Sequence, residues 1–211
     1  MKSAIAAVSA ALLVAMPAVA SASAFSIDFE NDWNANNVFA PDLRDYYNGG
    51  TADNGTSGPN LGVQFVNVSG LSNQSPDFTY YANAPSPLGT AFAHDSAFLN
   101  VAAGVSNALA FRYASPNDVV GAVRAFSGLN GTGTLLGTID LATNFIDGTY
   151  DNWSLATLRF GGVARSFDFT ASADAAGVLF DNVATVPEPG IGLMLAIGGV
   201  AAVGARRRRR A

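Results

Sequence analysis

The central part of this sequence predicts an all-β fold, an antiparallel β-sandwich or jelly roll, between two terminal segments that lie outside the fold. Short stretches with the composition of strands recur along residues 25–186, and turn-forming Gly, Asn and Asp separate them. No amphipathic helical stretch of ten residues interrupts the series. A regular succession of short strands without helices is typical of sandwiches and jelly rolls.

Residues 1–24 have the pattern of a signal peptide. Lys2 supplies a positive charge, a largely apolar stretch follows, and Pro17 precedes a run of small residues. Residues 22–24 (Ala-Ser-Ala) fit the small-x-small pattern that signal peptidase cleaves, and residues 18–20 are a second candidate. We therefore expect export and removal of the signal peptide, with an uncleaved N-terminal anchor as the alternative.

The first strand-like stretch comes directly after the signal peptide. Phe25, Ile27 and Phe29 alternate with polar residues there, so an extended chain places the three on one face. The later stretches are residues 61–68, 90–101 (one or two strands), 107–113, 119–126, 134–141, 154–160, 163–169 and 177–184.

Turn signals lie between these stretches. Asn130-Gly131 predicts a hairpin, and Gly161-Gly162 predicts a tight turn. Residues 48–60 are rich in Gly, Asn and Thr and predict a long loop. No Pro- or Ser-rich linker divides residues 25–186, so we expect one domain there.

The composition of residues 25–186 limits the functions of this domain. It holds 15 acidic residues against five arginines, and such a negative surface repels nucleic-acid phosphates. DNA and RNA are therefore not expected partners. The chain has no Cys, which excludes Cys-ligated zinc, iron–sulfur clusters and thiol catalysis. A domain of this size buries a core without disulfides.

The C-terminal segment, residues 187–211, has three parts. Pro187-Glu188-Pro189 forms a stiff spacer, because proline lacks an N–H and restricts φ. Residues 191–205 are apolar or small and, as a single transmembrane helix, would measure about 22 Å against a hydrocarbon core of about 30 Å. Local thinning and arginine snorkelling let so short a helix span. The cationic end consists of Arg206, Arg207, Arg208, Arg209 and Arg210.

This C-terminal arrangement resembles the PEP-CTERM sorting signal of exported proteins in Gram-negative bacteria that make extracellular polysaccharide. The resemblance covers about 25 of the 211 residues. It implies that an exosortase, a membrane-embedded Cys protease or transpeptidase, recognises Pro187, Glu188, Pro189 and the five arginines. It also implies cleavage near the PEP tripeptide and release or attachment at the cell surface. Many members carry an aromatic residue early in the apolar segment, and this chain does not.

The positive-inside rule places the arginines in the cytoplasm and the domain outside the cytoplasmic membrane. The apolar segment then anchors the chain in this membrane transiently. An ordinary tail anchor is the alternative interpretation. Under both interpretations we expect signal peptidase to act at the N-terminus. The exosortase is a processing partner at the C-terminus only under the sorting interpretation.

The domain itself resembles galactose-binding-like jelly rolls, which form many carbohydrate-binding modules. Residues 29–33 and 179–183 carry this resemblance, since they are similar to the first and last strands of such domains. It implies that these strands lie together and share a structural Ca²⁺, with oxygen ligands from Glu30 and Asp181. Ca²⁺ is the one cofactor that the resemblance suggests, and nothing else in the sequence requires a cofactor. The alternative is that Asp28, Glu30 and Asp32 form a charged, outward ladder on an edge strand.

No catalytic residue is predicted. The only histidine, His94, is followed by Asp95 and Ser96, but adjacent side chains of an extended chain point to opposite faces. A triad needs groups that converge from different elements, so we expect His94 to be a partly exposed strand or loop histidine. Sugar-binding candidates are the aromatic residues in or near polar segments, with strand-edge packing as the alternative: Trp33, Tyr46, Tyr47, Tyr80, Tyr81 and Trp153.

Together these patterns predict a non-enzymatic cell-surface or extracellular-matrix protein, sorted by an exosortase and associated with exopolysaccharide. Two alternatives stay open. One is a secreted polysaccharide-active hydrolase that uses a carboxylate pair. The other is a structural adhesin with protein partners.

Overall fold

The computed structural model describes residues 24–73, 79–146, 148–173 and 177–186. These residues form an all-β, antiparallel fold, as predicted, with two short 3₁₀ turns, η1 (Ala35–Asn37) and η2 (Thr170–Ser172). The predicted sorting residues, 187–211, and nearly all of the predicted signal peptide lie outside the described residues. The strands are β1 (Ser26–Ile27), β2 (Gln64–Ser72), β3 (Gly89–Ala114), β4 (Val119–Phe126), β5 (Leu135–Leu141), β6 (Ser154–Asp168) and β7 (Leu179–Val186).

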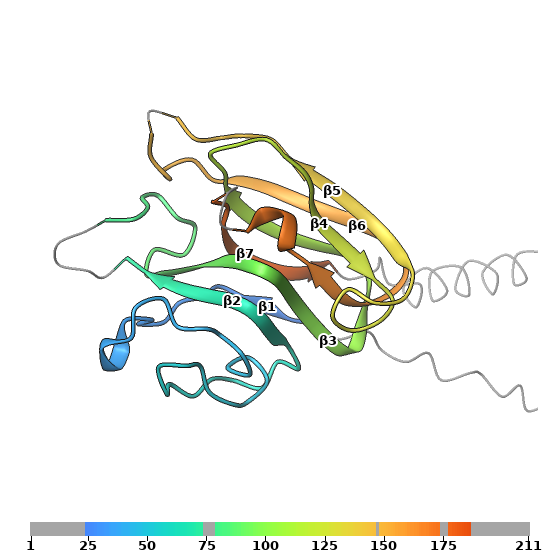
Figure 1. Ribbon diagram of the computed structural model, residues 1–211, viewed down its shortest axis with the longest axis horizontal. Coiled ribbons are helices and arrows are strands. Elements are labelled where there is room, and N and C mark those ends of the chain that lie inside the picture. The colour runs from blue at the N-terminus through green and yellow to red at the C-terminus, as the bar shows by residue number, and fades with distance from the viewer. Residues whose placement is uncertain (1–23, 74–78, 147, 174–176, 187–211) are drawn as a thin grey trace, which may run out of the picture.

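Hydrogen bonds join the described strands into one sheet of order β1-β7-β3-β6-β4-β5, and β2 pairs with β3 outside this path. The 26-residue β3 connects the sheet, because it pairs with β2, β6 and β7. Figure 1 shows β4, β5 and β6 together on one side of the domain and β1 and β2 on the other. The long strand thus links both groups around one core.

Strands β3 and β6 are each longer than the sequence predicts. Residues 90–101 and 107–113 form one strand, and Gly161-Gly162 lies inside β6 rather than at a turn, so that prediction is wrong. The pairing of β3 with β6 shifts register between Asn100 and Val105, and Gly162 has φ 88°. Glycine adopts positive φ in a bulge as readily as in a turn, so a Gly-Gly pair does not distinguish a bulge within one strand from a turn between two strands.

Two other turn predictions are confirmed. Asn130 (φ 52°) and Gly131 (φ 68°) lie in the connection between the paired strands β4 and β5. Residues 48–60 form a loop, and isolated bridges from Asn48 to Asn60 and from Thr51 to Ser57 join its two sides.

The first strand packs as its alternating pattern predicts. Phe25, Ile27 and Phe29 are all buried in the main core. Strand β1 pairs with β7 through Ser26 with Ala184 and Ile27 with Val183. The beginning and end of the described domain therefore lie side by side, which is the arrangement that the jelly-roll resemblance implies.

A search for membrane-spanning helices finds none among the residues that the structure describes. The predicted transmembrane segment, residues 191–205, lies outside them.

Candidate functional site

The fold brings the two predicted calcium ligands to one short stretch of backbone, residues 86–89. Glu30 Oε1 accepts hydrogen bonds from the N–H groups of Leu88 (2.7 Å) and Gly89 (3.2 Å). Asp181 Oδ2 accepts one from the N–H of Ser86 (2.8 Å). Because Glu30 follows β1 and Asp181 belongs to β7, the pairing of these two strands positions both carboxylates.

Asp181 is a fully buried carboxylate whose second oxygen, Oδ1, accepts the N–H of Asn182 at 2.7 Å. Burial raises the pKa of Asp181 to about 6, although its backbone hydrogen bonds act in the opposite direction. The neighbouring charges of Glu30 and Asp28 also contribute to this rise in pKa. Among the described residues no Arg forms an ion pair with Asp181. A cation would therefore relieve an electrostatic cost at this position.

The site offers carboxylate oxygens, which suit Ca²⁺, but few of them. Among the described residues no group of three or more His, Cys, Asp or Glu side chains is placed to hold a metal ion. Since Ca²⁺ takes six to eight oxygen ligands, a site at Glu30 and Asp181 would need backbone carbonyls or water as well. Calcium binding stays a prediction.

The alternative acidic ladder does not form. Strand β1 ends at Ile27, and Phe29 has φ 56°, so the chain is not extended through Asp32. Asp28 Oδ1 instead accepts the N–H of Glu30 at 3.2 Å, and Asp32 Oδ1 accepts the N–H of Asn34 at 3.1 Å. These local hydrogen bonds fold the segment into turns, whereas the alternation of acidic residues predicts a strand there.

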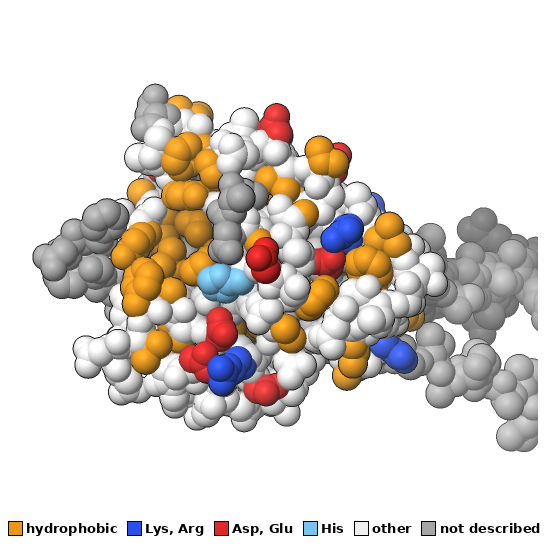
Figure 2. All heavy atoms as spheres, viewed as in Figure 1, with side chains coloured by type: hydrophobic (Ala, Val, Ile, Leu, Met, Phe, Trp, Pro, Cys, Tyr) orange, Lys and Arg blue, Asp and Glu red, His pale blue; other side chains and the backbone are white. Residues whose placement is uncertain are grey.

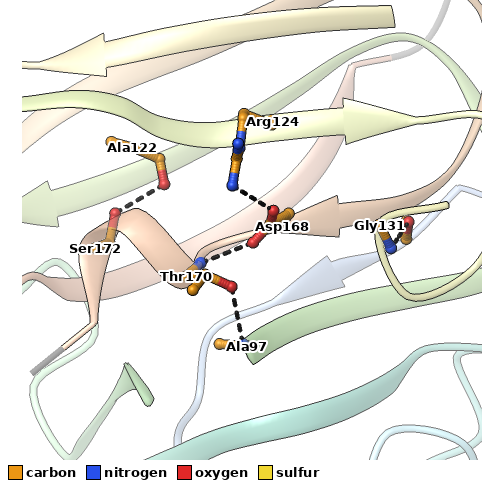
Figure 3. A network of polar contacts seen from close by, with 8 residues as sticks. Ala97, Ala122, Arg124, Gly131, Asp168, Thr170 and Ser172 are labelled. Carbon is orange, nitrogen blue, oxygen red and sulfur yellow. Dashed lines mark hydrogen bonds and ion pairs between the residues drawn. The ribbon is translucent and has the colours of Figure 1, made fainter. Parts of the chain in front are cut away.

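A second buried carboxylate, Asp168 of β6, lies in a network between strands (Figure 3). Arg124 of β4 contacts Asp168 Oδ2 through Nη2 at 2.8 Å, and the N–H of Thr170 donates to Oδ1 at 2.9 Å. Thr170 Oγ1 accepts the N–H of Ala97 in β3 at 3.2 Å. The network connects β3, β4, β6 and η2, so the role of Asp168 is structural.

His94 is a half-buried residue of β3, as expected. Its Nε2 lies 2.9 Å from Ser69 Oγ, which donates to Asp42 Oδ1 at 3.0 Å. Because the hydroxyl gives its only proton to the carboxylate, Nε2 donates to Ser69. A catalytic triad places the histidine between nucleophile and acid, whereas here the serine lies between the other two. The side chains of Asp95 and Ser96 are exposed and take no part.

An apolar hollow of about 280 Å³ opens on the face that carries the histidine (Figure 2). Figure 2 shows hydrophobic side chains gathered there, next to the histidine. The rings of Phe39 and Tyr80 are 5.6 Å apart, and Phe92 lies 4.9 Å from the ring of His94. Six of the lining side chains are Phe39, Leu71, Tyr80, Phe92, Tyr150 and Leu179.

The predicted aromatic candidates separate into two groups. Trp33, Tyr47 and Tyr81 are buried, so ordinary packing accounts for them. The other three are partly buried: Tyr80 lines the hollow, Tyr46 packs against the main core, and Trp153 packs against the ring of Tyr81. In each tyrosine pair one ring is buried and the other is partly exposed, but Tyr46 and Tyr47 lie in a turn with their rings 4.8 Å apart, so the extended-chain reasoning does not apply to that pair.

Sequence reasoning missed three of the rings in the hollow. Period-two alternation places Phe92 on the face opposite the buried Ala91 and Ala93, and this signal could have identified it. Phe39 and Tyr150 lie in irregular segments that carry no such periodicity.

The PEP-CTERM protein-sorting motif matches residues 185–210 of this chain. The chain therefore carries this sorting motif at its C-terminus, as the sequence predicts. Comparison with curated proteins finds no match.

Two solved structures are similar to the domain. The K2 cleaved adhesin domain of Lys-gingipain (Kgp) has a TM-score of 0.47 and 13% identity, over 78% of this chain and 99% of that chain. The module CsCBM6-3 from Clostridium stercorarium, solved in complex with cellobiose, has a TM-score of 0.37 and 17% identity, over 54% of this chain and 85% of that chain. Likenesses this distant carry no argument about what the present chain binds.

Proposed function

We propose that this chain is an exported cell-surface or extracellular-matrix protein that an exosortase sorts and processes through its C-terminal signal. The observation that carries the proposal is the sorting motif at residues 185–210, which begins within the last strand of an all-β domain. Signal peptidase removes residues 1–24 after export. Residues 191–205 then anchor the chain in the cytoplasmic membrane, with the arginines inside, until the exosortase acts.

We propose that residues 25–186 form one β-sandwich of the jelly-roll kind. Two features support it: β1 pairs with β7, and buried side chains from both groups of strands belong to one main core. Phe65 of β2, Val123 of β4 and Phe167 of β6 are members of this core. A shared core between two groups of strands is the defining feature of a sandwich.

The domain is non-enzymatic in this proposal. A glycoside hydrolase needs two carboxyl groups that face each other across a substrate cleft. Glu30 and Asp181 are instead hydrogen-bonded to the backbone of residues 86–89, and Asp181 is fully buried. The serine-centred arrangement at His94 likewise differs from a catalytic triad. These observations favour a binding or structural role over the hydrolase alternative.

We propose that the aromatic hollow associates with exopolysaccharide. Sugar rings stack on aromatic faces, and the hollow offers several such rings around about 280 Å³. The mature protein should sediment with the exopolysaccharide of its host, and Tyr80→Ala or Phe92→Ala should lower the bound fraction. Leu155→Ala is the control, because Leu155 is a 60% exposed side chain of β6 outside the hollow. Equal binding by all variants would count against this role.

Changes to the C-terminal sorting signal test the sorting itself. Deleting residues 187–211 should leave a chain that is exported and loses its signal peptide but is neither processed by the exosortase nor retained at the surface. Replacing all five arginines by Gln should give the same defect, whereas replacement by Lys keeps the charge that holds the tail inside. Unchanged location and processing after the deletion would contradict the proposed function.

A further inference from the structure

The sorting motif and the folded sheet overlap. The motif begins at residue 185, and β7 ends at Val186. Thr185 pairs with Leu109 and Val186 pairs with Ala108, so both residues belong to the ladder between β7 and β3. The first two residues of the motif are therefore part of the sheet.

Two residues outside the motif hold this end of β7. On one side, the N–H of Phe25 donates to Thr185 Oγ1 at 3.1 Å, and the N–H of Thr185 donates to the carbonyl of Phe25 at 3.1 Å. On the other side, Asn107 Nδ2 donates to the carbonyl of Val186 at 3.1 Å. Phe25 is itself buried, at 6% exposure, so the contact is anchored in the core.

The same contact involves the other predicted processing site. Signal-peptidase cleavage after Ala24 would make Phe25 the first residue of the exported chain. The new N-terminus would then lie hydrogen-bonded to the first residue of the sorting motif. Both ends of the mature domain thus meet at one place on the sheet.

The spacer between sheet and apolar segment is short. Four residues, Pro187 to Gly190, separate Val186 from Ile191, and even fully extended they reach at most about 14 Å. An enzyme embedded in the membrane must therefore act on the motif close to the end of β7. A residue whose backbone is paired in a sheet enters a protease site only after those hydrogen bonds break, which is costly.

We infer that the end of β7 sets the N-terminal limit of cleavage: the exosortase cuts C-terminal to Val186, and Thr185 and Val186 stay in the sheet of the mature protein. Phe25 and Asn107 are positioning residues for this step, because they act on it by holding the strand. The inference rests on the proposed function and adds to it a limit that the folded domain imposes.

The test is the intact mass of the processed chain from the native host, for wild type, Asn107→Gly and Asn67→Gly. Asn107 (φ 75°) and Asn67 (φ 51°) both have positive φ, lie at register shifts of β3 or β2, and donate from Nδ2 to backbone carbonyls. Glycine tolerates both conformations, so each variant removes mainly the side-chain hydrogen bond. Of these two asparagines only Asn107 contacts the end of β7, so Asn67 is the matched control.

We expect one C-terminal end at or beyond Val186 in wild type and in Asn67→Gly. Asn107→Gly should lose this single end and give additional, shorter chains that end before Val186. Thr185→Val, which removes the hydroxyl that contacts Phe25 and keeps a β-branched side chain, should do the same and serves if Asn107→Gly yields too little protein.

Two results would overturn the inference alone: a wild-type chain cut before Val186, or the same single end in Asn107→Gly, Thr185→Val and Asn67→Gly. An intact arginine tail in the wild-type chain would overturn the proposed function, and the inference with it.

Discussion

Two buried aspartates, Asp168 and Asp181, show how differently one domain stabilises the same side chain. Asp168 has an internal cation, since Arg124 lies 2.8 Å from it, and the N–H of Thr170 is a further donor. Asp181 is fully buried and is hydrogen-bonded to the backbone N–H groups of Ser86 and Asn182. The first is a closed structural network, whereas the second keeps a charge that a proton or a metal ion would neutralise.

The difference follows from the neighbours of each residue. Asp168 belongs to β6, where β4 places Arg124 directly opposite in the antiparallel register. Asp181 belongs to β7, next to a first strand followed by the acidic residues Asp28 and Glu30, which raise its pKa rather than lower it. Acidic neighbours around a buried carboxylate are the electrostatic condition for cation binding.

The largest expected effect is on the pH dependence of stability. Asp181 has a pKa of about 6 in the folded chain against about 3.9 when unfolded, so between these values the folded state binds more protons. This proton binding adds on the order of 2–3 kcal/mol to the free energy of unfolding below about pH 4, relative to neutral pH. The added stability is lost as the pH rises through 6. Urea unfolding across this range should show that loss in wild type.

Asp181→Asn removes the titrating group and should flatten this part of the pH profile, while Asp168→Asn should leave it in place. If the profile of Asp181→Asn matches that of wild type, Asp181 is not the group responsible.

The next effect is on stability near neutral pH. Asp168→Asn removes the charge that pairs with Arg124 and weakens the acceptor for the N–H of Thr170. We expect a loss of about 2 kcal/mol in the free energy of unfolding, because hydrogen bonds to charged, buried groups are the stronger ones. Denaturant unfolding at pH 7 measures it, and no loss would show that the network does not stabilise the fold.

Calcium should distinguish the two aspartates as well. At ten times its dissociation constant, Ca²⁺ bound only to the folded chain adds about 1.4 kcal/mol, or a rise of about 3–5 °C in Tm. The rise should be smaller at pH 5, where Asp181 is more protonated. Thermal unfolding with and without millimolar CaCl₂ measures both.

Glu30→Gln keeps an oxygen for the N–H groups of Leu88 and Gly89 but removes the charge, so it should abolish the calcium effect. Asp32→Asn is the matched control, since Asp32 is exposed and accepts only a local N–H. No shift in wild type at millimolar Ca²⁺ would contradict a calcium site.

The smallest effect should come from Arg124→Gln. The arginine side chain is 41% exposed, so water screens much of its attraction to Asp168. We expect a loss of about 1 kcal/mol or less, which shrinks as salt is added. Unfolding at low and high ionic strength tests this, and a large loss that is insensitive to salt would show that Arg124 acts through packing instead.

Local sequence patterns predicted the parts of this molecule that local physics determines. The alternation of Phe25, Ile27 and Phe29 identified a core-facing first strand, and Asn130-Gly131 identified a hairpin. Local glycine chemistry misled at Gly161-Gly162, because bulges and turns make the same conformational demand.

Long-range contacts were beyond the pattern. Ser69 lies between Asp42 and His94, and these three residues come from separate parts of the chain. Arg124 and Asp168 are likewise 44 positions apart. A single sequence gives the composition of such clusters but not the register that brings them together. Glu30 and Asp181 were identified through a family resemblance, and the fold then placed both on residues 86–89.

The central claim is that the C-terminal signal is a removable anchor, and the intact mass of the surface protein tests it most directly. The chain should be isolated from its native host with the exosortase present and from the same host with the exosortase deleted. The account predicts a mature chain without Arg206 to Arg210 in the first case and a chain that keeps them in the second. A chain that keeps its arginine tail in both hosts would contradict the account.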